Sequence, residues 1–160
     1  MPRKMVLAEP TISGDANIAN HIRDFFGLSN EDRIGRIQRV IMSNKVPVPL
    51  VENFMPVELV KLISKKEIRQ KKSVLRILSD KMDLQIGGGK IFLEAIAADQ
   101  EMSDILGCQV MEPFMCSRLF LRSVSIDPIE IVNYYMRADS YKVQFNVSLD
   151  DFDLSAFDDK

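Results

Sequence analysis

The stretch from residue 99 to residue 136, DQEMSDILGCQVMEPFMCSRLFLRSVSIDPIEIVNYYM, carries the strongest fold signal in the sequence. Apolar residues within Asp99–Leu106 recur at helical spacing, and Gly107 stands where a helix is expected to stop. Phe114–Val124 and Pro128–Met136 are then typical of two strands joined by a short turn. The stretch therefore predicts a helix followed by an antiparallel hairpin.

The first third of the chain shows the same order. Ala16–Phe26 predicts a helix that ends at Gly27, and Arg33–Met42 and Val46–Met55 predict a long hairpin. Two prolines in Val46–Met55 suit either an edge strand or a strand that is entered late, and both interpretations stay open. Because helix, glycine and hairpin follow one another twice, we predict an internal repeat of two similar halves.

The remaining patterns complete an α+β fold. Further helices are predicted at Val57–Ile63 and Ser73–Met82, a turn at Thr11–Asp15, and strands at Met5–Glu9, Leu84–Ala97 and Tyr141–Val147. Together the elements predict a single antiparallel sheet of about six strands flanked by helices. With 160 residues the chain has the length of one domain, which we expect to span residues 1–160.

Composition excludes several classes of protein. A hydrophobic fraction of 46% and a charged fraction of 28% are typical of a soluble globular domain. No apolar run approaches the ~20 residues of a membrane span, and no signal-peptide core follows the N-terminus, so we expect a cytoplasmic protein. A net charge of −2 does not predict a general nucleic-acid surface.

Charge is unevenly distributed along the chain. Seven basic residues between Lys61 and Arg76 predict a solvated pair of helices. Residues 150–160 are rich in aspartate and are expected to form a flexible, solubilising tail.

Metal and nucleophile chemistry is disfavoured. The single histidine, His21, is expected at the surface or boundary of a helix, and no second histidine is available for a metal site or a catalytic triad. Cys108 and Cys116 have apolar neighbours and predict buried free thiols. We therefore predict no metal, no cofactor and no catalytic residues.

Gly87-Gly88-Gly89-Lys90 lacks the spacing of a phosphate-binding P-loop. Three glycines within a strand mark either a structural bulge or a close backbone approach to a ligand, and both interpretations stay open. Arg36, Arg39 and Arg118 lie on predicted strands, where a buried guanidinium needs an anionic partner.

A family resemblance rests on two motifs. Residues 98–107, ADQEMSDILG, precede a hairpin that ends in Tyr-Tyr-x-Arg-Ala-Asp-x-Tyr at residues 134–141, and the first hairpin ends in Phe54-Met55-Pro56. This arrangement resembles the UTRA domain, the effector-binding domain of the HutC branch of GntR transcription regulators. Its fold is shared with chorismate pyruvate-lyase. The resemblance implies a small-molecule pocket, homodimerisation, and DNA contact only through a winged-helix domain absent from this chain, with residues 1–4 as the end of a linker.

The resemblance also implies site residues. Arg39 matches the first of two arginines with which the family binds acidic effectors, and Ile41 stands at the second position. Glu52 lies one residue beyond Val51, which occupies the family's acidic position. The predicted effector site, for a small carboxylate or phosphate between the two hairpins, comprises Arg39, Glu52, Gly88, Gly89, Lys90, Arg118 and Tyr134. Arg137 and Asp139 are expected to form a structural ion pair.

Two other functions remain open. A chorismate-lyase-like enzyme would use Arg39 and Arg118 for the two carboxylates of the substrate and Glu52 as the acid. A purely structural dimerisation domain would have an empty pocket. The Arg-Ala-Asp-x-Tyr motif favours the regulator.

Overall fold

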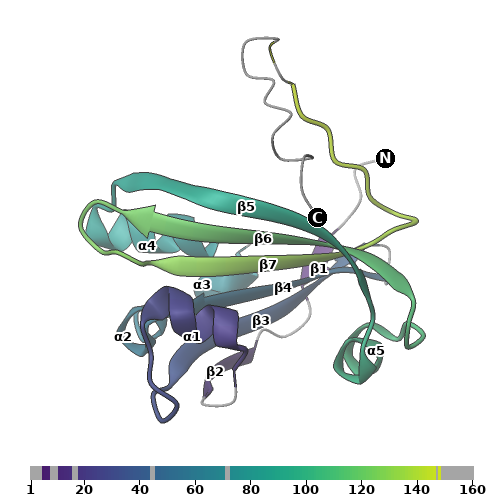
Figure 1. The fold of residues 1–160 in the computed structure, drawn as a ribbon, viewed down its shortest axis with the longest axis horizontal. Helices are drawn as coiled ribbons and strands as arrows, with labels where there is room; N and C mark the ends of the chain where they lie inside the picture. The colour runs from purple at the N-terminus through teal and green to yellow at the C-terminus, as the bar shows by residue number, and fades with distance from the viewer. Residues whose placement is uncertain are drawn as a thin grey trace.

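The computed structural model describes residues 5–7, 11–15, 18–43, 46–70, 73–146 and 148. They form one antiparallel sheet with helices on both of its faces (Figure 1). The strands are β1 (Met5–Leu7), β2 (Thr11–Asp15), β3 (Ile34–Ser43), β4 (Val46–Met55), β5 (Ile86–Ala97), β6 (Pro113–Ser123) and β7 (Glu130–Arg137). The helices are α1 (Asn20–Phe26), α2 (Val57–Val60), α3 (Lys65–Arg69), α4 (Val74–Met82) and α5 (Gln100–Leu106).

The strands lie in the order β1-β3-β4-β7-β6-β5, and β2 also pairs with β3. The predicted α+β class with a single antiparallel sheet is confirmed, with five long strands and the two short ones beside β3. Of the two interpretations of Val46–Met55, the edge strand is wrong, because β4 lies between β3 and β7. Both prolines lie near the beginning of β4, as expected of a strand that is entered late. β7 pairs with β4 only from Pro49 onward, and the residues after Pro49 keep the N–H donors that this pairing needs.

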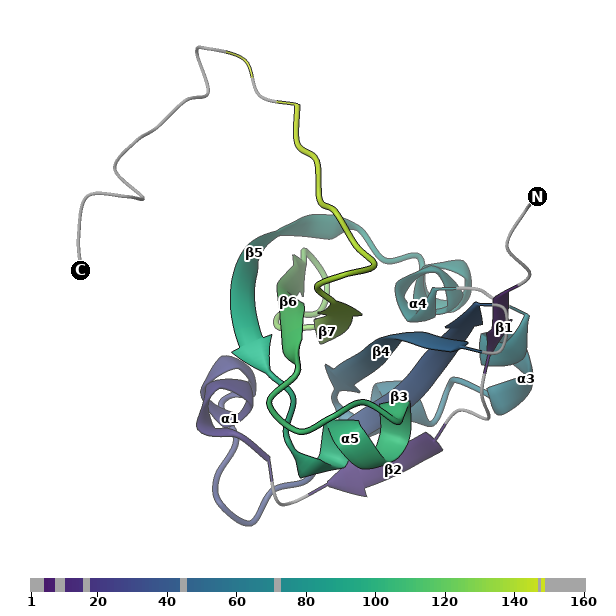
Figure 2. The ribbon, with the colours of Figure 1, turned by 90° about the vertical axis from the view of Figure 1, so that its right-hand side faces the viewer.

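One face of the sheet, which we call the inner face, packs against α2, α3 and α4. The view along the strands shows the sheet curving around α4 (Figure 2). Ile37, Val51 and Val132 of the sheet share a core with Ile77 and Leu78 of α4, and all five are buried. This apolar layer fixes α4 over the centre of the inner face.

The opposite face, which we call the outer face, carries α1 and α5. Ile22 of α1 packs on Phe54 and Ile131, while Met102 of α5 belongs to a second cluster with Phe114. Because successive side chains of a strand point to opposite faces, each long strand contributes to both layers.

Both predicted helix stops are confirmed. Gly27 and Gly107 follow α1 and α5 with φ of 64° and 67°, the left-handed conformation that glycine adopts without a steric cost. Asp99 caps α5 by accepting a hydrogen bond from the Met102 N–H at 2.8 Å. Helix α1 begins later than predicted, because Ala19 has extended backbone angles.

Two short segments differ from the predictions. Thr11–Asp15 is a strand rather than a turn, since it pairs with β3 from Ile34 to Gln38. Residues 141–146 are not in a strand, and Val147 lies outside the described residues. Residues 1–4 and 150–160 also lie outside them, and the internal repeat stays a prediction.

The two cysteines are buried free thiols, as predicted. Burial raises the pKa of the Cys116 thiol to about 11. Among the described residues, no helix is long and apolar enough to cross a membrane.

Candidate functional site

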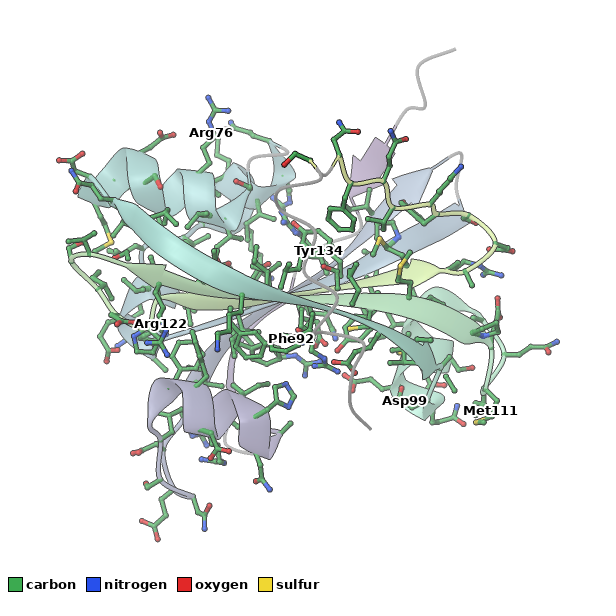
Figure 3. All side chains as sticks on the ribbon, turned by 45° about the horizontal axis from the view of Figure 1, so that its top comes forward. Arg76, Phe92, Asp99, Met111, Arg122 and Tyr134 are labelled. Carbon is green, nitrogen blue, oxygen red and sulfur yellow. The ribbon has the colours of Figure 1, made fainter. Side chains whose placement is uncertain are left out.

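A cavity of about 120 Å³ lies on the inner face, beneath the N-terminal end of α4. Its floor comes from β3, β4, β6 and β7, and Tyr134, which is labelled in Figure 3, belongs to its lining. The lining residues are Arg39, Asn53, Ser73, Val74, Leu75, Leu119, Leu121, Glu130, Val132 and Tyr134. We call this space the inner cavity.

Three buried polar side chains gather in the inner cavity. Arg39, Asn53 and Glu130 are 7%, 2% and 0% exposed, and Asn53 Nδ2 donates a 2.6 Å hydrogen bond to Glu130 Oε1. Among the described residues, the other oxygens, Asn53 Oδ1 and Glu130 Oε2, have no hydrogen-bond partner. A buried polar atom left unpaired costs about 1–3 kcal/mol, so such atoms are expected to meet a bound molecule or an ordered water.

Burial dominates the electrostatics of this cluster. It raises the pKa of Glu130 to about 7, although the Asn53 hydrogen bond and the positive charge of Arg39 act in the opposite direction. Burial also lowers the pKa of Arg39, against the influence of Tyr134 and Glu130. Glu130 is therefore able to accept or donate a hydrogen bond near neutral pH.

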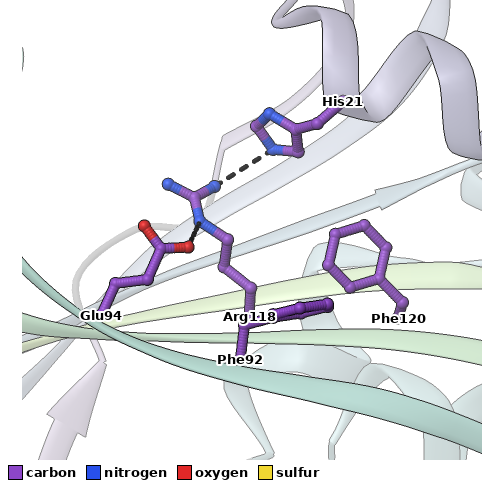
Figure 4. A pocket seen from close by; sticks show the side chains of 5 residues that line it. All are labelled: His21, Phe92, Glu94, Arg118 and Phe120. Carbon is purple, nitrogen blue, oxygen red and sulfur yellow. Dashed lines mark hydrogen bonds and ion pairs between the residues drawn. The ribbon is translucent and has the colours of Figure 1, made fainter. Parts of the chain in front are cut away.

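The outer face carries an open groove between α1 and β5. Its two hollows, of about 320 and 500 Å³, share the rings of Phe92 and Phe120, and we call them together the outer groove. In the smaller hollow Arg118 lies 3.2 Å from Glu94 and 3.1 Å from the ring of His21 (Figure 4). Burial first, and then the charge of Arg118, lowers the pKa of His21.

The larger hollow of the outer groove contains the glycine run. Gly87, Gly88, Gly89 and Lys90 line it, opposite Phe25 of α1. The pairing of β5 with β6 is irregular between Ile86 and Gly88, so the structure confirms a bulge at the glycines.

Glu52 belongs to a charge network on the outer face. Arg36 Nε donates a 2.7 Å hydrogen bond to Glu52, and Arg36 also pairs with Glu101 at 3.0 Å. Burial alone would lower the pKa of Arg36, but Glu52 and Glu101 raise it above its usual value. The buried carboxylate of Glu52 is thus compensated within the fold.

The structure does not bring the seven predicted site residues into one pocket. Arg39 and Tyr134 line the inner cavity. The other five lie at the outer face: Glu52, Gly88, Gly89, Lys90 and Arg118. The reason is strand geometry, because Arg39 pairs with Val51 and the next residue, Glu52, points to the opposite face.

Sequence reasoning missed Asn53 and Glu130. The strand alternation of β7 could have identified Glu130. Because every second residue of a strand lies on the same face, Glu130 shares a face with Val132 and Tyr134. The predicted ion pair of Arg137 with Asp139 is present at 3.6 Å, but Arg137 also pairs more closely with Glu112.

The UTRA domain family matches residues 13–142. The chain belongs to the UTRA domain family. Its structure is similar to the C-terminal domain of the histidine utilization repressor from Pseudomonas syringae pv. tomato, with a TM-score of 0.73, 15% identity, and coverage of 91% of this chain and 99% of that one. No curated protein matches the sequence.

Two further solved structures have the same fold. A GntR-family transcriptional regulator from Enterococcus faecalis aligns with a TM-score of 0.71, 17% identity, and coverage of 90% of this chain and 100% of that one. The ligand-binding domain of a Bordetella bronchiseptica protein assigned to the GntR family aligns with a TM-score of 0.71, 14% identity, and coverage of 91% and 88%. As a UTRA domain, this chain is an effector-binding domain of a transcription regulator and not a lyase of the same fold.

Proposed function

We propose that the UTRA domain binds a small anionic metabolite in the inner cavity and transmits its presence to a DNA-binding domain. The observation that supports this site is the buried cluster of Arg39, Asn53 and Glu130, with two oxygens that no described residue satisfies. Such a buried polar cluster adds little to the stability of a fold, whereas its polar groups can fix the orientation of a bound ligand.

The side chains define the ligand chemistry. A guanidinium only donates hydrogen bonds, so a ligand atom that meets Arg39 is an acceptor such as a carboxylate or phosphate oxygen. Asn53 Oδ1 and an ionised Glu130 require a donor. The ligand class that satisfies both is a small acid that also bears a hydroxyl or amino group.

The size of the cavity limits the ligand. Its volume of about 120 Å³ corresponds to a few water molecules at ~30 Å³ each. We expect a compact metabolite rather than a nucleotide or an oligosaccharide. The phenol of Tyr134 in the wall supplies one further hydrogen-bonding group.

The proposal includes the partners of the domain. We expect a homodimer, as the family resemblance implies, because a regulator that binds a palindromic site has two-fold symmetry. DNA contact belongs to a separate domain, and the cytoplasm is the compartment in which a bacterial regulator meets DNA.

A thermal-shift screen with small hydroxy and amino acids tests the site, because a ligand that binds only the folded state raises the melting temperature. Calorimetry then compares the first hit with Arg39→Ala. The loss of one charged hydrogen-bond partner costs about 1.5–3 kcal/mol, so we expect affinity to fall roughly ten- to a hundred-fold.

Arg76→Ala is the matched control, because Arg76 lies exposed on the solvent side of α4, the helix that covers the cavity (Figure 3). This variant should bind like the wild type. Tyr134→Phe serves as a second probe that keeps the ring and removes one hydroxyl. Wild-type affinity in both Arg39→Ala and Tyr134→Phe would contradict the assignment to the inner cavity.

A further inference from the structure

Strand β5 is an edge strand with an unusually apolar surface. It is the last strand in the sheet order and pairs only with β6 among the described strands (Figure 1). Ile91, Phe92 and Leu93 at its centre are 53%, 49% and 42% exposed. Proteins usually protect such edges with charge, proline or a covering segment, because an exposed strand edge pairs readily with another strand.

The free edge of β5 presents a regular row of backbone groups. The Ala98 N–H donates to the Glu112 carbonyl at 2.9 Å, in register with the β5–β6 pairing. Hydrogen-bonded and non-hydrogen-bonded residues alternate along an antiparallel pair. Gly89, Ile91, Leu93 and Ala95 therefore direct their N–H and C=O groups away from β6, toward the open edge.

The side chains of β5 complement a second copy of the same strand. In an antiparallel pair centred on Phe92, Lys90 of one chain stands opposite Glu94 of the other, and this pairing occurs twice by symmetry. Both residues lie on the outer face, where they line the outer groove. Opposite charges directly across a strand pair are stabilising.

The same register matches the remaining side chains. Ile91 faces Leu93 of the second copy on the inner face, and the two Phe92 rings meet on the outer face. Shifting the centre by two residues in either direction places Lys90 opposite Lys90 or Glu94 opposite Glu94, which is repulsive. Centres on Ile91 or Leu93 also keep the faces aligned, but they place Lys90 opposite Phe92 or Ile96 and lose both Lys90–Glu94 pairs. The register centred on Phe92 is the one that forms these charge pairs.

We propose that two copies of this chain dimerise by antiparallel pairing of their β5 edges around Phe92. The inference deepens the proposed function, since it assigns a surface to the homodimer included there. The Glu94 carboxylate already contacts Arg118 through one oxygen and is half exposed, so its second oxygen is available to Lys90 of the second copy.

Charge reversal with restoration tests the register. Light scattering of the full-length chain at tens of micromolar should give the mass of a dimer. Lys90→Glu and Glu94→Lys each place like charges opposite one another at both symmetric pairs. Each variant should weaken dimerisation by about fourfold to several hundred-fold, since a cross-strand charge pair contributes ~0.2–1 kcal/mol and the sign of two such pairs is reversed.

Mixing the Lys90→Glu and Glu94→Lys variants tests whether residues 90 and 94 of the two chains face each other. In a mixed dimer, position 90 of each chain again faces a residue of opposite charge at position 94 of the other, so the dimer mass should return. Lys66→Glu and Glu31→Lys, at exposed positions in α3 and before β3, are controls that should stay dimeric. Circular dichroism of every variant confirms the fold.

Several outcomes would overturn the proposal. A monomeric wild type, dimeric single variants, or a mixture that stays monomeric would each exclude β5 pairing in this register. If removing residues 149–160 dissolved the dimer while both reversals left it intact, the tail would be the pairing segment. The ligand proposal stands apart, because its readout is binding to the inner cavity rather than mass.

Discussion

Glu130 is a residue whose burial costs stability but whose carboxyl group suits ligand binding. It is the first residue of β7 and lies between the buried Ile129 and Ile131. Its side chain is entirely buried, where a leucine would pack at no electrostatic cost. Its hydrogen bond from Asn53 holds one oxygen, and the other oxygen has no partner among the described residues. The neighbouring Arg39 supplies the opposite charge for a ligand that carries both an acid and a hydrogen-bond donor.

Substitution of Glu130 by glutamine should change the pH dependence of stability. The pKa of the folded carboxyl is about 7, whereas the unfolded value is 4.5. The folded state therefore binds more protons within this window, and stability falls as pH rises through it, by up to about 3 kcal/mol. Urea denaturation at about pH 5 and about pH 8 measures this loss.

Glu130→Gln removes the ionisation and should lose less stability over the same interval. The comparison of the two proteins cancels the contributions of all other carboxyl groups. Identical pH dependence in the wild type and Glu130→Gln would show that Glu130 titrates normally, which is incompatible with its burial.

The elements with clear periodicity could be predicted from the sequence, but their order in the sheet could not. Helices α4 and α5 and the strands of both hairpins were predicted within a few residues, because alternation and helical spacing are local signals. The sequence left open whether β4 is an edge strand, because strand order depends on pairing with β7, far along the chain. The same non-local pairing turned Thr11–Asp15 into a strand.

The close packing of α2 against β3 gives an element-scale prediction. A Cβ at Gly35 would lie 2.1 Å from Val60 Cγ2 and 3.0 Å from the Met55 carbonyl oxygen. Gly35→Ala should therefore force α2 away from β3 and cost about 1–3 kcal/mol in the free energy of unfolding. Gly14→Ala in β2 is the control, because a Cβ there would meet no heavy atom within 4 Å, and thermal denaturation compares the two. Equal stability of both variants would contradict the packing of α2 on β3.

At the scale of the whole molecule, the curved sheet separates two environments that the sequence could not distinguish. Seven residues with suitable chemistry were predicted, and the inner cavity contains two of them, Arg39 and Tyr134. The five others line the outer face, because a shift of one residue along a strand exchanges the faces. Family motifs identified the fold and the class of protein, whereas assigning side chains to a face required the register.

The most direct test of the account is an amide chemical-shift titration of the labelled domain with the first acid that raises its melting temperature. We predict shifts at Asn53, Val132 and Tyr134, which line the inner cavity, with the amides of Gly88 and Phe92 in the outer groove unchanged. Shifts concentrated at Gly88 and Phe92, with Asn53 and Val132 unmoved, would place the effector on the outer face and contradict the central claim.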